Sequence, residues 1–202
     1  MTDWYKIKRI MIRPNWVEKQ VYPGKKVQTF DFQNDWALGW TGYNYGYWTP
    51  TIEAHQWWYI WTSTGWQYQG YVIAPSSIFG GTLKKIKIWA YRPSTSPNNA
   101  IWIYTSTGND SRFEYGRENN SIYVNWTKIT ATPRYWEITI ELTFWSSLGI
   151  EVSDGTNTDT YNWWDVVAGF QTQWENQNLW LMLGRWIANK CYIRKVEITT
   201  KP

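Results

Sequence analysis

Apolar and polar residues alternate with a period of two along much of the chain, which is the pattern of strands that bury one face. The alternation is clearest over residues 83–91 and 135–144. In the first of these runs Ile86, Ile88 and Ala90 fall on one face. Turn-forming residues separate the runs about every ten residues, as in an antiparallel two-sheet sandwich. The pattern therefore predicts an all-β domain, with further strands at 27–32, 56–62, 67–73, 100–105, 112–115, 121–124, 149–153, 158–161, 178–183 and 192–199.

The first 24 residues form a unit of their own in this pattern. The alternation predicts strands at 5–12 and 17–22, joined as a β-hairpin across the turn at Pro14-Asn15, before Pro23-Gly24 interrupts the chain. We therefore predict a hairpin leader over residues 1–24 and a main domain over residues 25–202. Within that domain, residues 34–53 are rich in Gly, Tyr and Trp and are expected to form a long loop, and 164–174 is a helix candidate of poor periodicity.

Composition and charge narrow the function classes. Hydrophobic residues make up 43% of the chain and charged residues 18%, which excludes disorder. The net charge of +4 is scattered, without the basic stripe or motif of a nucleic-acid-binding protein, so no nucleic-acid partner is expected. No apolar run reaches membrane-spanning length, and the N-terminus has no signal-peptide core. With one cysteine, Cys191, and one histidine, His55, neither an internal disulfide nor a histidine metal cluster is available.

Tryptophan is unusually frequent in this chain. The chain has 19 Trp against 14 Gly, although Gly is among the commonest residues in proteins. Five Trp follow Asn or Asp directly, where Asn-Gly and Asp-Gly would be strong hairpin signals because type I′ turns need φ > 0. Two of these pairs, Asn15-Trp16 and Asn125-Trp126, lie where a turn is expected. Our hypothesis is that some Trp occupy glycine positions, through a UGA codon that means Gly in the source but was translated as Trp.

The leader KIKRIMIRPNWVEKQVYP, residues 6–23, resembles a short N-terminal segment of phage-type virion and tail proteins and of related bacterial surface proteins. In those proteins the turn is usually Asn-Gly, in line with the hypothesis at Trp16. The resemblance implies that residues 1–24 join other virion or surface subunits. It also implies a location on a virion or extracellular surface without a recognisable signal peptide, and it allows a homo-oligomer.

Three segments of the main domain resemble strands of concanavalin A-like, LamG-type domains. Phe30-Asp31-Phe32 followed by Leu38-Gly39-Trp40 is similar to their opening strand, residues 83–88 to an inner strand, and residues 191–198 to the closing strand. The resemblance extends over most of residues 25–200. It implies a jelly-roll sandwich that binds glycans or proteins at a sheet face or rim.

Aromatic side chains in the predicted long loop are the leading binding candidates. Exposed aromatic faces can stack on the apolar C–H edges of pyranose rings, and functional residues are frequent on loops. An alternative is that the loop folds its tyrosines back over the edge of the sandwich. The candidate ligand-binding residues are Tyr43, Tyr45, Tyr47 and Trp48 of this loop, together with Trp58 from a second possible aromatic platform at His55-Gln56-Trp57-Trp58.

The alternation also places Glu137, Thr139 and Glu141 on one strand face. This strand resembles the Glu-Ile-Asp-Ile-Glu strand of retaining glucanases with the same fold, in which the two Glu act as nucleophile and general acid. Here Thr139 replaces the middle Asp and cannot supply the charge that keeps the pKa of the acid high. A solvated polar strand face is the simpler interpretation, and Glu137 and Glu141 are catalytic only in the alternative of a glycoside hydrolase.

A cluster of oxygen ligands, Asp154, Asn157 and Asp159, could hold Ca²⁺. The spacing misses an EF-hand loop, and a hairpin with Asp154-Gly155 at its turn is the preferred interpretation. The sequence thus predicts a non-catalytic binding module that presents its loops to a glycan or a host-surface protein. The alternatives are the glycoside hydrolase and a structural particle subunit without a ligand.

Overall fold

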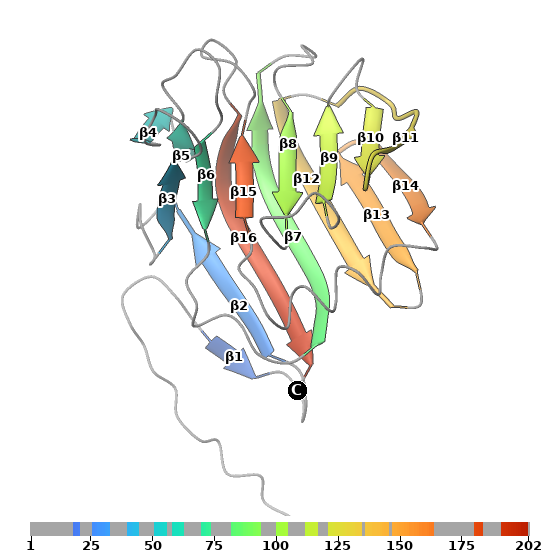
Figure 1. Cartoon of the computed structure of the whole chain (residues 1–202), viewed down its shortest axis with the longest axis horizontal. Coiled ribbons are helices and arrows are strands. Elements are labelled where there is room, and N and C mark those ends of the chain that lie inside the picture. The colour runs from blue at the N-terminus through green and yellow to red at the C-terminus, as the bar shows by residue number, and fades with distance from the viewer. Residues whose placement is uncertain are drawn as a thin grey trace, which may run out of the picture.

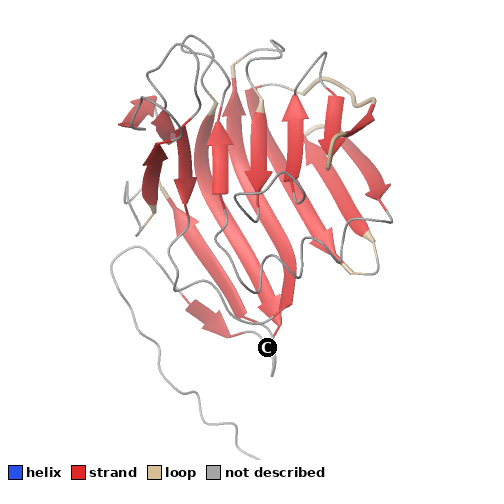
Figure 2. Ribbon diagram, viewed as in Figure 1, coloured by secondary structure: helices blue, strands red, loops and turns tan. Residues whose placement is uncertain are grey.

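The computed structural model describes residues 18–20, 26–32, 40–44, 51–55, 58–62, 70–73, 82–93, 100–104, 112–116, 121–134, 136–145, 147–163, 180–183 and 191–201. In these residues the ordered elements are strands, and the pairings between them are antiparallel (Figure 2). No helix of the described part is long and apolar enough to cross a membrane. The helix candidate at 164–174 and the predicted leader strand at 5–12 lie outside the described residues.

The strands form two sheets that face each other (Figure 1). The first is a 9-stranded sheet built on the order β1 (Glu18–Gln20), β2 (Lys26–Asp31), β16 (Tyr192–Lys201), β7 (Thr82–Arg92), β12 (Trp136–Phe144), β13 (Leu148–Ser153) and β14 (Thr158–Trp163). The hairpin of β4 (Thr51–His55) and β5 (Trp58–Thr62) joins it through β16. The second is a 7-stranded sheet in the order β11 (Thr127–Ile129), β10 (Ser121–Val124), β9 (Arg112–Gly116), β8 (Ile101–Tyr104), β15 (Trp180–Leu183), β6 (Gly70–Ile73) and β3 (Thr41–Asn44).

The core lies between the sheets and follows the alternation read from the sequence. In β7 the residues Ile86, Ile88 and Ala90 are fully buried on the predicted common face, while Lys87 and Trp89 between them lie on the outer face. Burial of such aliphatic side chains, at about 1.5–3 kcal/mol each, is what holds the two layers together. Other buried core residues come from both sheets and include Phe30, Ile103, Phe113, Ile140, Leu142, Val152, Leu181 and Val196.

The predicted all-β, antiparallel two-sheet fold is confirmed, with two differences in detail. Residues 34–53 were expected to be one long loop, but Thr41–Asn44 and Thr51–His55 form β3 and β4. The prediction of a loop was wrong for β3 because this strand is stabilised by backbone pairing with β6, which the local sequence does not indicate. In the leader, Glu18–Gln20 pairs with Lys26–Gln28 of β2, so this part of residues 1–24 forms an edge strand of the 9-stranded sheet.

Two predicted turns are confirmed. Gly155, with φ +87°, lies in the connection between β13 and β14. Asn125 and Trp126 form the two-residue turn between β10 and β11, with φ of 45° and 74°. Positive φ at both central residues is the mark of a type I′ turn, for which Asn-Gly is the preferred pair. The Asn162-Trp163 pair, in contrast, lies within β14 and forms no turn.

Candidate ligand-binding site

A short connection at one end of the sandwich, residues 130–134, leads from β11 in the 7-stranded sheet to β12 in the 9-stranded sheet (Figure 1). One tyrosine from each sheet holds it. The Tyr115 hydroxyl of β9 donates to the Thr132 carbonyl at 3.3 Å and accepts from the Arg134 N–H at 2.9 Å. The Tyr161 hydroxyl of β14 accepts from the Thr132 N–H at 3.3 Å. Burial raises the pKa of Tyr115 to about 12, so its phenol stays neutral at physiological pH.

Beneath this connection lies the fully buried side chain of Arg92, the last residue of β7. Its Nη1 donates to the Arg134 carbonyl at 3.0 Å, and its Nη2 donates to the Gly116 carbonyl at 3.3 Å. The guanidinium lies 5.4 Å from the centroid of the Tyr115 ring. Gly116 has φ +90°, and a Cβ atom there would lie 2.7 Å from Nη2 of Arg92. Only glycine fits at this position.

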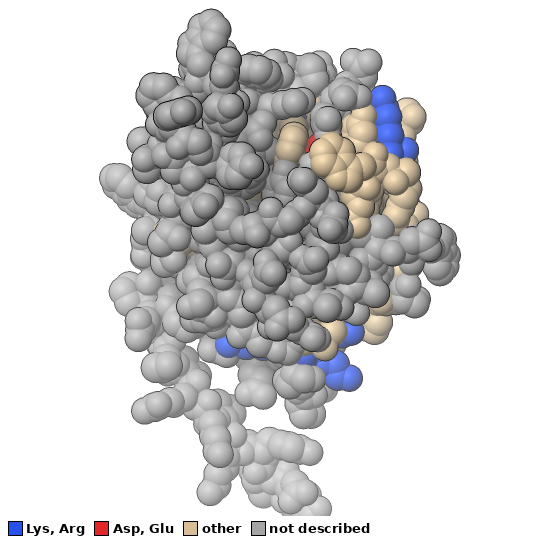
Figure 3. All heavy atoms as spheres, in the orientation of Figure 1, with Lys and Arg blue, Asp and Glu red and all other residues tan. Residues whose placement is uncertain are grey.

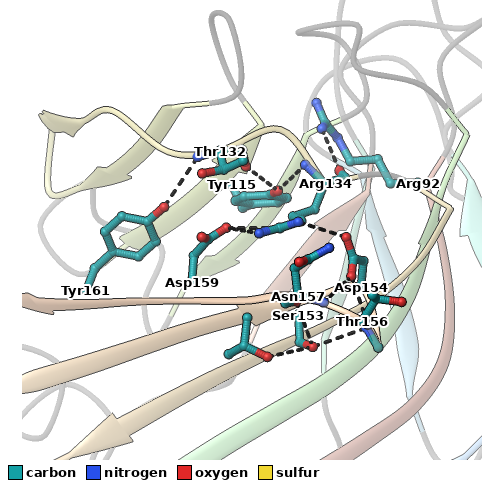
Figure 4. Close-up of polar contacts among 12 residues, drawn as sticks. Arg92, Tyr115, Thr132, Arg134, Ser153, Asp154, Thr156, Asn157, Asp159 and Tyr161 are labelled. Atoms are coloured by element: carbon teal, nitrogen blue, oxygen red, sulfur yellow. Dashed lines mark hydrogen bonds and ion pairs between the residues drawn. The ribbon is translucent and has the colours of Figure 1, made fainter.

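The side chain of Arg134 bridges two carboxylates of the β13–β14 hairpin (Figure 4). Its Nε and Nη2 contact Oδ2 of Asp159 at 2.9 and 2.7 Å, and its Nη1 contacts Oδ2 of Asp154 at 2.9 Å. The Arg134 side chain is only 11% exposed. Burial alone would lower the pKa of Arg134, but the hydrogen bonds that its guanidinium donates to Asp159 and Asp154 raise it. Arg134 is therefore a permanently charged group held in one orientation.

Asp154 is fixed from its other side by its own turn. Its Oδ1 accepts hydrogen bonds from the backbone N–H groups of Thr156 at 3.0 Å and Asn157 at 2.8 Å, which is the usual role of Asp in a turn. These backbone bonds, together with Arg134, lower the pKa of Asp154 from 3.8 to about 2. The carboxylate is therefore ionised at any physiological pH.

An open cleft of about 490 Å³ adjoins this ion-paired group. Its volume lies in the range of about 300–1,000 Å³ that small-molecule sites occupy. Glu137, which lines the cleft, is exposed. Trp136 lines it as well and is 55% exposed. The lining residues are Pro133, Arg134, Trp136, Glu137 and Asp154.

The predicted strand face with Glu137, Thr139 and Glu141 is present on the outer side of the 9-stranded sheet, opposite the buried side chains of β12. Lys85 and Lys87 of β7 contact the Glu141 carboxylate at 2.5 and 3.2 Å. Although burial would raise it, these two lysines lower the pKa of Glu141. A general acid of a retaining glycosidase needs the opposite shift, since it must be protonated when the substrate binds. Glu141 is therefore held as a carboxylate.

The aromatic residues predicted for binding are only partly described. Tyr43 lies in β3 opposite Tyr71, and Trp58 is the first residue of β5, opposite His55. Tyr45, Tyr47 and Trp48 lie outside the described residues. The registers of β3, β6, β15, β8 and β9 place Tyr43 in one row with Glu114, the neighbour of Tyr115. Because Tyr43 and Glu114 are level along the strands, β3 ends at the same end of the sandwich as the cleft. Four strand spacings, about 19 Å, separate the two residues across the sheet, so β3 lies at the opposite side of that end from the cleft.

The predicted calcium ligands are engaged in another way. The carboxylates of Asp154 and Asp159 hold Arg134, and the Asn157 carbonyl accepts a hydrogen bond from the Asp154 N–H at 3.1 Å. Since Ca²⁺ takes six to eight oxygen ligands, it would have to displace the guanidinium from between these carboxylates. In the described part of the chain, His, Cys, Asp and Glu side chains form no group of three or more that could hold a metal ion.

Charge is distributed in separate groups over the described surface. On the face shown in Figure 3, described Lys and Arg side chains appear at the lower edge and at the upper right, and they form no continuous stripe. On the outer face of the 9-stranded sheet, Lys87 and Lys195 lie over the ring of Trp89, at 5.2 and 4.5 Å from its centroid, and Lys195 also pairs with Glu197 at 2.5 Å. These lysines therefore sit among aromatic and acidic neighbours.

The sequence interpretation missed Arg134 as a site residue. The two acidic residues of the hairpin were recognised as a cluster, but their partner is 20 and 25 residues away in the sequence. The available signal was that Pro133-Arg134 precedes the strand that pairs with this hairpin, which brings a cation near the two carboxylates.

The chain has the fold of a concanavalin A-like jelly roll, with two antiparallel sheets. Solved structures share that fold. Peanut lectin has a TM-score of 0.58 at 8% identity, over 88% of this chain and 97% of that chain. Winged bean acidic lectin in complex with methyl-α-D-galactose has a TM-score of 0.52 at 10% identity, over 87% and 98%. The exoplasmic/lumenal domain of VIP36, in a form with bound Ca²⁺ and Man3GlcNAc, has a TM-score of 0.52 at 10% identity, over 81% and 84%. No known family model matches the chain, and no curated protein sequence matches it.

Proposed function

We propose that this chain is a lectin-like module that binds a glycan at the loop end of the sandwich, in the cleft beside Arg134. The observation that carries the proposal is the cleft itself, an open volume of about 490 Å³ whose lining includes the fixed Arg134 and the two acidic residues Glu137 and Asp154. The fold adds support, since structures with this architecture include a lectin solved with methyl-α-D-galactose and a domain solved with Man3GlcNAc.

The groups of the cleft suit sugar hydroxyls. A guanidinium has five N–H donors, and the contacts of Arg134 with Asp154 and Asp159 leave donors for a ligand oxygen. The carboxylates of Asp154 and Glu137 are acceptors for hydroxyl donors. Hydrogen bonds with charged partners contribute about 1.5–3 kcal/mol each. Because Arg134 and Asp154 are fixed before any ligand arrives, the loss of side-chain entropy on binding is small.

Display on a virion or cell surface is the second part of the proposal, with residues 1–24 as the attachment segment. Its support is the likeness of residues 6–23 to leaders of virion and surface proteins, and the position of β1 at the edge of the 9-stranded sheet, next to β2. Among the described residues β1 is the outermost strand on that side, and an outermost strand can pair with a strand of another chain. The partner there would be another subunit of the particle or surface.

A glycan-array screen tests the binding site. The purified protein is compared with Glu137→Gln, which removes a carboxylate of the cleft, and with Glu151→Gln, a matched change at an exposed residue of β13. We expect a specific signal that Glu137→Gln reduces at least tenfold and Glu151→Gln leaves unchanged.

Two other outcomes contradict the proposed site or the proposed function. A signal lost in Tyr45→Ala but kept in Glu137→Gln would move the site to the 43–48 segment. The absence of any signal from a folded sample would contradict glycan binding and favour the ligand-free structural subunit.

A further inference from the structure

Two tryptophans have a backbone conformation that suits glycine. The described residues contain three non-glycine positions with positive φ: Asn125 at 45°, Trp126 at 74° and Trp136 at 65°. Asn tolerates this region because its short side chain bonds locally, whereas for a bulky residue it is an outlier. Glycines of the same structure occupy the same region, Gly116 at 90° and Gly155 at 87°.

The turn that contains Trp126 is also of a type that favours glycine at this position. Trp126 is the second central residue of the two-residue turn between β10 and β11, in which Val124 pairs with Thr127. Asn-Gly is the preferred pair of such a turn, because both central residues need φ > 0. The Trp126 side chain is 54% exposed, so the core does not require the ring.

Trp136 is an independent case. It follows Tyr135 rather than Asn or Asp, so no turn dipeptide marks it in the sequence. It opens β12 opposite Arg92, with φ 65° and 55% of its surface exposed. Trp40 shows what a packed tryptophan of this chain looks like, since it is 2% exposed and its ring meets those of Phe30 and Phe32 edge-on at 5.5 and 5.6 Å.

We propose that positions 126 and 136 are glycine in the natural protein, and that tryptophan stands there because a UGA codon that means Gly in the source has been translated as Trp. The excess of Trp over the whole chain, 19 against 14 Gly, has the same explanation. It follows that the exposed rings at these two positions are not part of a natural ligand site.

Peptide mass spectrometry of protein isolated from its natural source tests the proposal. Cleavage after glutamate releases one peptide, residues 119–137, that contains both positions. Recombinant protein of the printed sequence, digested in parallel, supplies the reference mass with Trp at both. We expect the natural peptide to be lighter by two Trp-to-Gly differences, with Gly at 126 and 136 in the fragment spectrum. Trp at both positions would overturn the proposal, as would UGG rather than UGA at these codons in the gene.

Discussion

Replacing Trp126 by glycine in the recombinant protein should make it more stable. A non-glycine residue in the left-handed region carries strain of about 1–2 kcal/mol, which Trp126→Gly removes. Glycine also loses more backbone entropy on folding, which costs about 0.5–1 kcal/mol. The Trp126 ring is 54% exposed, so little packing is lost with it. The net expectation is a stabilisation of about 0.5–1 kcal/mol.

Trp145 provides a matched control. It is 61% exposed, lies in the connection between β12 and β13, and has no positive φ. Trp145→Gly therefore carries the entropy cost without relieving strain, and it also removes the contact of Lys84, whose Nζ lies 5.7 Å from the ring centroid. We expect a loss of about 0.5–1.5 kcal/mol. The two variants should thus differ by about 1–2.5 kcal/mol, and most of this difference reports the strain at position 126.

Urea unfolding followed by circular dichroism measures both free energies without relying on tryptophan fluorescence. Trp126→Ala separates the loss of the ring from the relief of strain, because it keeps the Cβ atom and should gain nothing. The reasoning is refuted if Trp126→Gly loses as much stability as Trp145→Gly at an unchanged dependence on urea.

Two further predictions concern the base of the site. Gly116→Ala should lower the free energy of unfolding in urea by about 2–4 kcal/mol, because the new Cβ would lie 2.7 Å from Arg92 Nη2 at φ +90°. Gly155→Ala is the control, since its φ is +87° but nothing lies within 4 Å, and it should lower the free energy of unfolding less. Equal losses in the two variants would contradict the packing argument. For Asp154, a pKa lowered from 3.8 to about 2 means that its contribution to stability is complete above the unfolded pKa and is lost as pH falls through the folded one. Stability should therefore fall between about pH 4 and pH 2 more steeply in the wild type than in Asp154→Asn, and parallel curves would show that this carboxylate is not the titrating group.

The fold could be predicted from the sequence because its signals are local. The alternation around Ile86 and Ile88 specifies which face of β7 is buried, and Asp154-Gly155 and Asn125-Trp126 mark turns that the structure contains. The edge strand β3 was missed because its hydrogen bonds come from β6, which is distant in the sequence. The strand β4 was missed for another reason, since it pairs with the neighbouring β5 in a local hairpin that the alternation of residues 51–55 did not reveal.

The site was harder to predict, since it is assembled from separate connections. Arg134 comes from the crossing between the two sheets, its carboxylates from a hairpin of the 9-stranded sheet, and Tyr115 from the 7-stranded sheet. A sequence pattern can register two nearby acids, but not which cation the fold brings between them. The conformation of Trp136 was unpredictable for a related reason, because φ there is imposed by the entry into β12 rather than by a turn dipeptide.

Position 136 bears on both the proposed glycan site and the proposal that glycine is the natural residue there. The glycan site rests on Arg134, Glu137 and Asp154, and Arg134 is held by Tyr115, Asp154 and Asp159, none of which is a tryptophan. With glycine at position 136 the cleft loses one wall but keeps its charged groups. Trp136→Gly should therefore retain the specific array signal that Glu137→Gln removes. Loss of the signal in Trp136→Gly, with the fold intact by circular dichroism, would make the ring part of the site and contradict glycine as its natural occupant.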